Sequence, residues 1–271
     1  MTATEHVAVG TAVRPAAPRR RGRLLRQSGA LLRRNLLQFK GDPLQALDIL
    51  MPMALGGIFI AVFGGAVRDI GTDYTQYLLP GIMIQAVSIV SVATGIGLSM
   101  DFATGTMDRF RALPVARASV LIGRVAADVC RMAVALLLVF LFSLVIGFRV
   151  EGGPAGALGA LLLMLAFGVA LSWISAFIGL AIRAPQTVQS VGYAWLVPLQ
   201  FVSSLFVPTS TMPGWLQGVV TVNPMTLICD SARGLMLGTD VARPLAGALA
   251  WITGITVLFA VAAVRQYTRR T

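Results

Sequence analysis

Long apolar runs constrain this chain more than any other feature. They extend for roughly 17 to 28 residues, and a helix needs ~20 apolar residues to cross a bilayer. Only 12% of the 271 residues are charged, about half the share in an ordinary soluble domain. We therefore predict an all-α integral membrane protein with six transmembrane helices. The expected spans lie near residues 47–67, 78–98, 123–148, 155–182, 191–207 and 244–264.

The chain before the first span divides into two parts. Residues 1–22 are rich in Ala, Pro, Thr and Arg, so we expect a disordered tail. Residues 23–40 carry leucines at helical spacing with arginines between them, which predicts an amphipathic helix at the membrane interface. Gly and Pro at the end of this stretch predict its termination. Residues 23–271 are then one membrane domain.

The distribution of basic residues predicts the orientation. With the N-terminus inside, eighteen of the 22 basic residues fall on the inner side and four, Arg68, Arg149, Arg233 and Arg243, on the outer side. Cytoplasmic loops carry the excess of Lys and Arg, so we expect a multi-pass protein of the cell membrane with both termini in the cytoplasm. Contact with nucleic acid requires a basic face on a folded soluble domain. No such domain is visible, so nucleic acid is not an expected partner.

A polar segment at residues 101–117 separates the second and third spans. It places Phe102, Met107 and Phe110 at helical spacing, which is suited to an apolar knob for the groove of a partner protein. The alternative is a positive loop that only sets topology, but such a loop needs arginines and not these side chains. In the next span, Arg124, Asp128 and Arg131 are spaced to meet on one helix face.

The region 208–243 is too interrupted by Pro and Gly for one span and too apolar for a plain loop. We expect two short helices that dip into the outer half of the membrane, where irregular backbone must be shielded by protein or water. Asp230 and Arg233, three residues apart, could pair there. The alternative is an ordinary amphipathic helix on the surface.

Catalytic and metal-binding motifs are missing from the sequence. A nucleotide-binding P-loop needs Gly-Lys-Ser/Thr, but the only lysine, Lys40, lies between Phe39 and Gly41. The only histidine, His6, lies in the tail, so no metal site is expected. We predict a chain that is not an enzyme and binds no cofactor. Four of the spans also lack ionisable groups in their cores, which disfavours an ion-coupled transporter without excluding it.

Seven short sequence motifs follow one another along the chain, and each of them is weak evidence by itself. They are Gly41-Asp-Pro43, Val62-Phe-Gly-Gly-Ala66, Tyr77-Leu-Leu-Pro-Gly81, Thr104-Gly-Thr-Met-Asp-Arg-Phe-Arg-Ala-Leu-Pro114, Phe206-Val-Pro208, Met212-Pro-Gly-Trp-Leu216 and Asn223-Pro224. Over residues 23–265 the chain resembles the membrane subunit of ABC-2 exporters, especially the daunorubicin-resistance-type permeases. The resemblance implies six spans, a cytoplasmic coupling helix after the second span and re-entrant outer helices before the last.

The resemblance also implies partners. A separate ATPase subunit, present in two copies, would bind ATP and Mg, and a second permease chain would complete the transporter, in the simplest case as a homodimer. Many relatives have a further carboxylate near Asp101, where this chain has Met100, Phe102 and Ala103. The residues implied to lie at the ATPase are Arg33, Arg34, Asp101, Gly105, Thr106, Met107, Asp108, Arg109 and Phe110.

The implied cargo is a hydrophobic or amphiphilic compound, such as a drug or secondary metabolite, moved out of the cell. Lipid or glycan export by the same architecture is the alternative, and an ATP-independent membrane protein is a further one. Polar and soft residues of the second and fifth spans are the pathway candidates, although they serve equally as contacts between helices. These candidates are Met83, Gln85, Ser88, Gln200, Phe201, Ser203 and Ser204.

Two further pairs of small residues predict close helix approach. They are Gly168 with Ser172 and Ser175 with Gly179, each four residues apart. Packing within one subunit and a seam between two subunits are both compatible with this spacing.

Overall fold

The computed structural model describes residues 44–63, 73–104 and 117–270, and in these residues every regular element is helical. The tail at 1–22, the interface helix at 23–40 and the loop residues 105–110 lie outside this part of the chain. The helices are α2 (Leu44–Phe63), α3 (Tyr74–Ala103), α5 (Arg117–Ile146), α6 (Gly153–Ala181), α7 (Pro185–Phe201), α8 (Gly214–Val222), α9 (Pro224–Leu237) and α10 (Ala242–Arg270), with a 3-10 turn η2 (Thr209–Thr211).

Four of the described helices are long and apolar enough to cross a membrane, and the all-α prediction is confirmed. They are α3, α5 from Arg124 onward, α6, and α10 as far as Thr268. These helices correspond to the second, third, fourth and sixth expected spans. The regions of the first and fifth spans contain α2, whose described apolar stretch Met51–Val62 is shorter, and the 17-residue α7.

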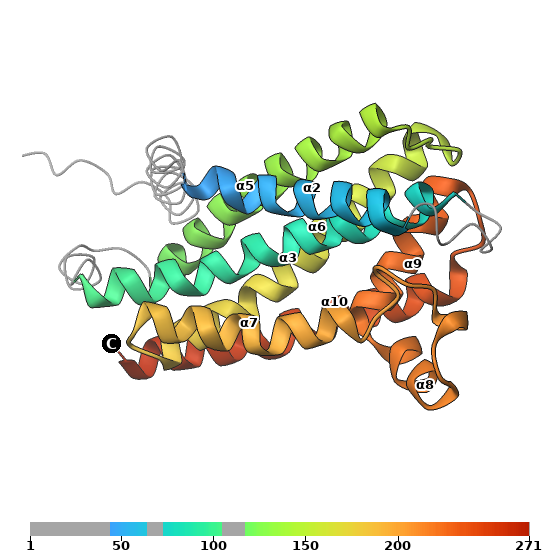
Figure 1. Cartoon of the computed structure of the whole chain (residues 1–271). Helices are drawn as coiled ribbons and strands as arrows, with labels where there is room; N and C mark the ends of the chain where they lie inside the picture. Colours follow the sequence, from blue (N-terminus) through green and yellow to red (C-terminus); the bar gives the residue numbers. More distant parts are fainter. Residues whose placement is uncertain (1–43, 64–72, 105–116, 271) are drawn as a thin grey trace, which may run out of the picture.

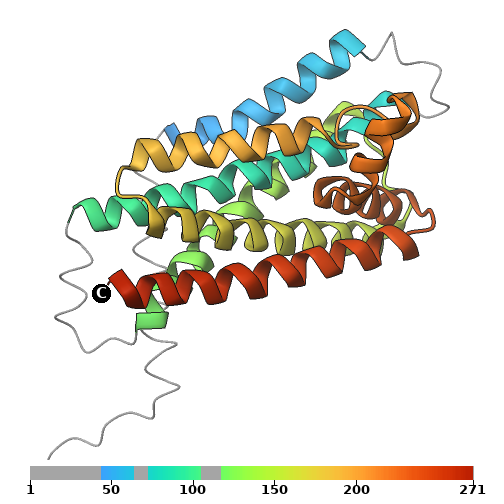
Figure 2. The same cartoon turned by 90° about the horizontal axis from the view of Figure 1, so that it is seen from below.

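Helix α3 is the centre of the bundle, with α2, α5, α6, α7 and α9 all packed against it (Figures 1 and 2). Most of its residues are buried on every side. Helices α5 and α10 instead expose most of their apolar side chains. Apolar faces of this length are unfavourable in water, so they agree with a membrane environment.

Small residues allow α3 and α6 to approach each other closely. A Cβ on Gly95 would lie 2.3 Å from the carbonyl oxygen of Ser175, and one on Gly179 would lie 2.2 Å from the carbonyl oxygen of Gly95. A Cβ on Gly168 would lie 2.3 Å from a methyl group of Val87. The two predicted small-residue pairs therefore contribute to packing inside one subunit.

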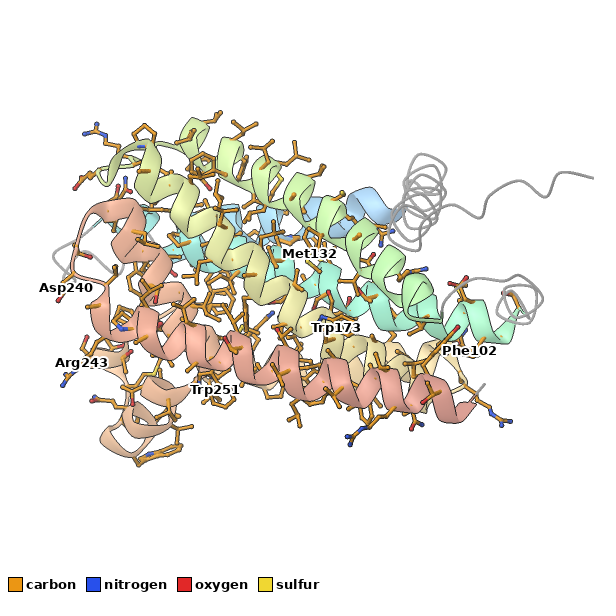
Figure 3. The ribbon with its side chains drawn as sticks, turned by 180° about the vertical axis from the view of Figure 1, so that it is seen from behind. Phe102, Met132, Trp173, Asp240, Arg243 and Trp251 are labelled. Carbon is orange, nitrogen blue, oxygen red and sulfur yellow. The ribbon has the colours of Figure 1, made fainter. Side chains whose placement is uncertain are left out.

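The bundle has two different ends. One end, which we call the basic end, contains the end of α3, the start of α5, the start of α7 and the C-terminus (Figure 1). Helices α8 and α9 and the start of α10 lie at the opposite end, which we call the α9 end. Figure 3 labels Phe102 at the basic end and Asp240 and Arg243 at the α9 end.

Two short helices precede α10, as predicted, but α9 is not a surface helix. Asn223 caps the start of α9 with a hydrogen bond of 2.8 Å from the backbone N–H of Met225 to its side-chain oxygen. Gly238 ends the helix in the left-handed conformation, with φ of 73°. Most residues between these caps are buried against α3, α6 and α10. The alternative of an ordinary surface helix is therefore wrong for α9.

The helix of the expected fifth span ends earlier than predicted. It was expected to continue to 207, but α7 ends at Phe201 and the chain continues without helical structure to Pro208. Residues 203–206 are nevertheless buried. Side chains from α9 and its N-cap Asn223 supply hydrogen bonds to this segment.

Candidate functional site

An ion-pair network at the basic end joins α3 to α5. Asp128, of which only 1% is exposed, lies 3.7 Å from the guanidinium of Arg124 and 3.5 Å from that of Arg131. These pairs confirm that the three side chains share one helix face. Arg124 also approaches Asp101 of α3 to 3.4 Å. A buried carboxylate without such partners would be strongly destabilising, so the network anchors the start of α5.

Arg124 is held closely against the backbone of α3. A Cβ on Gly97 would lie 1.6 Å from the Nη2 atom of Arg124, so a side chain there would displace the guanidinium from its present position. Ser99, one turn before Ala103, donates hydrogen bonds of 3.2 and 3.1 Å to the carbonyl groups of Ile182 and Arg183. The last turns of α3 are thus tied both to α5 and to the connection between α6 and α7.

The structure describes only the beginning of the predicted coupling element. Asp101 belongs to the last turn of α3 and is paired within the chain, as above. Phe102, expected to contribute to an apolar knob for a partner, packs edge-on against Tyr267 of α10, with ring centroids 6.2 Å apart. Gly105, Thr106, Met107, Asp108, Arg109 and Phe110, together with Arg33 and Arg34, lie outside the described residues, so their predicted contact with an ATPase stays a prediction.

A second polar cluster lies at the α9 end and is centred on Arg233. This side chain is buried, and all five of its N–H groups have acceptors. Nε donates to the carbonyl group of Tyr77 at 2.8 Å, and Nη1 donates to Asp230 at 2.8 Å and to the hydroxyl group of Ser204 at 3.5 Å. Nη2 donates to the carbonyl groups of Ser204 at 2.7 Å and Leu205 at 3.1 Å. The predicted Asp230–Arg233 pair is therefore confirmed.

Burial and the neighbouring groups act in opposite directions on the pKa of Arg233. Burial alone would lower the pKa of its guanidinium, but neighbouring Cys229, Tyr77 and Asp230 raise this pKa, and the balance lies above the ordinary value. The side chain is thus a permanent positive charge. Burial also raises the pKa of the Cys229 thiol to about 12, although Arg233 lowers it in part.

The non-helical segment after α7 depends on side chains of α9 and its cap. Asn223 donates to the carbonyl groups of Leu199, at 2.9 Å, and Val202. The backbone N–H of Ser204 donates to the hydroxyl group of Thr226 at 3.1 Å. With Arg233, these contacts satisfy backbone groups that have no helical partner. Irregular backbone survives at membrane depth only when it is shielded in this way.

Six of the seven pathway candidates are buried inside the subunit. Met83 belongs to the main apolar core, Ser88 donates 2.7 Å to the carbonyl group of Ile84, and Ser204 donates 2.8 Å to Asp230. Ser203 donates to the carbonyl group of Gln200. Only Phe201, 65% exposed, lies on the surface. In this conformation, packing within the chain explains Met83, Ser88, Ser203 and Ser204.

Gln85 and Gln200 differ from the other candidates. The side-chain oxygen of Gln85 and the side-chain nitrogen of Gln200 are buried and make no hydrogen bond with the described residues. The two helices are antiparallel, and Gly192 of α7 lies against Val92 of α3. Gln200 is eight residues after Gly192 and Gln85 is seven before Val92, so the two amides lie at nearly the same height. Most buried polar groups have hydrogen-bond partners, and an exception is explained by a bound water or ion, by strain or by a functional role.

Sequence reasoning missed the residues that connect distant helices. Tyr77, Asn223 and Thr226 organise the α9 end, and the Arg124–Asp101 contact spans two helices. Asn223 before Pro224 is a recognisable helix start, because Asn is a preferred N-cap and Pro a preferred first residue. The side chains that Arg233 and Arg124 contact in other helices have no such local signal.

The described part of the chain contains no cluster of metal-binding side chains. Among residues 44–63, 73–104 and 117–270, no group of three or more His, Cys, Asp or Glu side chains is arranged to hold a metal ion. The polar clusters at both ends consist of charge pairs and hydrogen bonds to backbone. They position helices and do not form a recognisable catalytic arrangement.

Comparison with known proteins identifies the family. Residues 26–237 match the family model described as ABC-2 type transporter. The chain is 39% identical over 235 residues to the Daunorubicin resistance ABC transporter permease protein DrrB1 of Streptomyces coeruleorubidus, covering 86% of this chain and 83% of the relative. It is 28% identical over 222 residues to the Probable doxorubicin resistance ABC transporter permease protein DrrC of Mycobacterium tuberculosis, covering 82% and 80%.

A more distant relative is the Putative transport permease ycf38 of Cyanophora paradoxa. It is 23% identical over 210 residues, covering 76% of this chain and 72% of the relative. The family match extends from before α2 to the end of α9 and includes both polar clusters. The chain therefore belongs to the ABC-2 type transporter family, as a non-catalytic membrane permease subunit of an ABC transporter.

Proposed function

We propose that this permease forms the membrane pathway of an ATP-driven exporter for hydrophobic or amphiphilic compounds. The basic end lies in the cytoplasm, both termini lie there too, and α2 and α7 complete a set of six spans. Two copies of a separate ATPase subunit bind ATP and Mg, and two permease chains, identical in the simplest case, enclose the pathway. The names of the two resistance permeases among the relatives support a drug as cargo.

The observation that carries this proposal is the ion-pair network beside the predicted coupling segment. Residues 105–116 connect α3 to α5, and Asp101, Arg124, Asp128 and Arg131 join the two helices next to that connection. A force applied to the segment therefore moves both helix ends together. Because α3 packs against five other helices, this displacement reaches the whole bundle. ATP binding by the partner would in this way select between inward-facing and outward-facing states.

The cargo pathway is proposed to run along α3 and α7. Phe201 is exposed on α7, and its ring lies 5.8 Å from that of Phe206, which stacks at 5.2 Å on Phe59 of α2. This aromatic row suits a large apolar or aromatic compound. Gln85 of α3 and Gln200 of α7 each have one buried side-chain atom without a hydrogen-bond partner among the described residues. When α3 and α7 separate, these amides would offer hydrogen bonds to polar groups of the cargo.

The deciding experiment is co-expression with candidate ABC ATPases, followed by co-purification and transport in proteoliposomes. We expect a stable complex in which daunorubicin or another amphiphile stimulates ATP hydrolysis and accumulates in the vesicles in an ATP-dependent manner. Stimulation by lipids or glycans instead would favour the alternative cargo class. Transport that an imposed ion gradient drives without the ATPase would contradict the proposal.

A further inference from the structure

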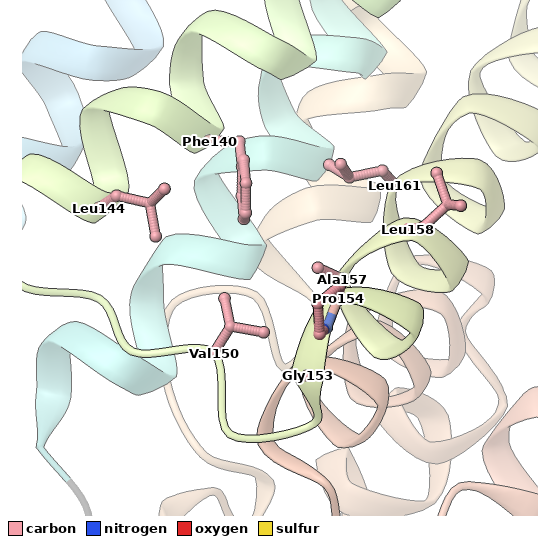
Figure 4. Close-up of a pocket in the computed structure, with 8 residues that line it drawn as sticks. All are labelled: Phe140, Leu144, Val150, Gly153, Pro154, Ala157, Leu158 and Leu161. Carbon is pink, nitrogen blue, oxygen red and sulfur yellow. The ribbon is translucent and has the colours of Figure 1, made fainter.

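An apolar hollow of about 440 Å³ lies between α5 and α6 near the α9 end (Figure 4). Its volume falls within the ~300–1,000 Å³ range of small-molecule sites in proteins. Every residue that lines it is apolar. The lining includes Phe140 and Leu144 of α5, Val150 of the connection, and Pro154, Ala157 and Leu158 of α6.

Hydrogen bonds fix the connection between α5 and α6, which borders this hollow. On the α5 side, the N–H of Phe148 donates 2.9 Å to the carbonyl group of Ser143. The side chain of Gln76 donates 3.3 Å to the carbonyl group of Gly147 and accepts 3.2 Å from the N–H of Arg149. On the α6 side, the N–H of Gly152 donates 2.8 Å to the carbonyl group of Met236. These bonds hold the connection between α5 and α6, which contains the lining residue Val150, in a defined position.

The composition of the walls indicates what fills the hollow. A drug-like ligand is normally oriented by a few polar groups, and this lining has no polar side chain. Helix seams between membrane subunits are rich in small residues. The exposed side chains of α5 that are close in sequence to Phe140 and Leu144 are instead large and aliphatic, among them Leu137, Leu141 and Val145. A flexible hydrocarbon chain fits such walls better than either a polar ligand or a second helix.

The rim of the hollow carries two exposed side chains of opposite charge, Arg149 and Glu151, on either side of the lining residue Val150. Arg149 immediately precedes Val150 in the lining, is exposed, and has no ion pair with any described residue. It lies at an end of two membrane-crossing helices, where lipid head groups are found. We propose that the hollow binds one acyl chain of a phospholipid whose phosphate contacts Arg149. Its assignment to the outer leaflet rests on the proposed orientation, whereas the binding itself does not.

Photolabelling of the full-length chain in lipid nanodiscs tests this site. The discs contain phosphatidylethanolamine and phosphatidylglycerol, with a trace of phosphatidylglycerol that carries a diazirine midway along one acyl chain. We expect labelled peptides to concentrate on residues 140–161. Ala157→Phe fills the hollow and should lower this labelling at least about fivefold, since overpacked sites exclude ligand. Ala155→Phe, on the exposed side of the same helix, is the matched control and should leave it unchanged.

Charge variants test the head-group contact. Arg149→Gln should weaken capture of the anionic probe about two- to fivefold, the range of an exposed charge pair. Arg243→Gln, at the same end of the bundle, should have no effect. Glu151→Gln should not lower capture, because its carboxylate repels phosphate. Equal labelling of the outward faces of α5 and α10, unaltered by Ala157→Phe, would overturn the proposal.

A second copy of the chain is the competing occupant. In a background with Cys130→Ala and Cys229→Ala, Leu158→Cys should give no disulfide-linked dimer in the membrane. A high yield of that dimer would mean that the hollow is closed by another permease, and would also overturn the proposal. None of these measurements requires an ATPase, so their outcome is independent of the proposed export function.

Discussion

The guanidinium of Arg233 lies 3.6 Å from the ring centroid of Tyr77 and donates a hydrogen bond of 2.8 Å to the carbonyl group of the same residue. The Tyr77 hydroxyl in turn donates 2.6 Å to the carbonyl group of Ser204. One pair of side chains therefore holds together the first turns of α3, the non-helical segment after α7 and the helix α9. The planar guanidinium matters here, because it combines stacking with five donors in fixed directions.

Replacing Arg233 with Lys should destabilise the permease although the charge is kept. An ammonium group has three donors and cannot reach all the carbonyl groups while stacking on Tyr77. Leaving buried acceptors without partners costs about 1–3 kcal/mol, so we expect a lower midpoint of thermal unfolding in detergent. Arg243→Lys, which alters an exposed arginine at the same end, is the control. Equal midpoints for the two variants would contradict the role assigned to Arg233.

A methyl group on Gly95 should separate α3 from α6. It would meet the carbonyl oxygen of Ser175 at 2.3 Å, and overpacking of this kind costs about 1–3 kcal/mol. Gly254→Ala in α10 is the matched control, because a Cβ there has no atom within 4 Å. This control should be neutral or slightly stabilising, by about 0.5 kcal/mol, since Ala favours a helix over Gly. Thermal unfolding of both variants in the same detergent measures the difference.

Replacing Gln85 and Gln200 with Leu should lower transport without lowering the stability of the fold. Because a side-chain atom of each amide is buried without a partner, an apolar side chain of similar size is expected to be neutral or stabilising. Export of a cargo that uses these amides should fall nevertheless. Thermal unfolding and ATP-dependent transport are measured on the same preparations. Lower stability would instead assign the two residues to packing between helices.

The combined substitutions Asp108→Asn and Phe110→Ala should uncouple ATP hydrolysis from transport. They remove a charge and an aromatic side chain from the predicted coupling segment, while the described helices are untouched. Membrane insertion should remain normal, and the co-purified ATPase should hydrolyse ATP without cargo movement. Asp240→Asn, at the α9 end, is the control. Unchanged coupling in the double variant would exclude these two residues as the point of force transfer.

Cys229 should resist maleimide in the folded protein. Its side chain is buried, and its pKa of about 12 lies above the usual 9.0, so the reactive thiolate is scarce at pH 8. Unfolding restores the ordinary pKa and exposes the thiol. Cys130, which is partly exposed, serves as the internal reference. Mass spectrometry before and after denaturation should show Cys229 modified only in the unfolded chain.

Prediction from sequence succeeded where the determining interactions are local. Apolar runs of sufficient length predicted α3, α5, α6 and α10, because the bilayer imposes their length and composition. The pairs Arg124–Asp128 and Asp230–Arg233 followed from the spacing of residues on a single helix. The early end of α7 was not predictable in this way, since Ser203 and Ser204 continue an apolar stretch and the side chains that bind Ser204, those of Thr226, Asp230 and Arg233, lie in α9.

The long apolar runs alone therefore determined a helical membrane protein, and the recurring motifs its resemblance to exporter permeases. Only the tertiary structure decided which helix lies at the centre and which of the candidate pathway residues are buried. It also decided that Arg124 reaches Asp101 and that Arg233 serves the backbone of Tyr77, Ser204 and Leu205. Those contacts join residues far apart in the sequence, so they exist only after the helices have packed.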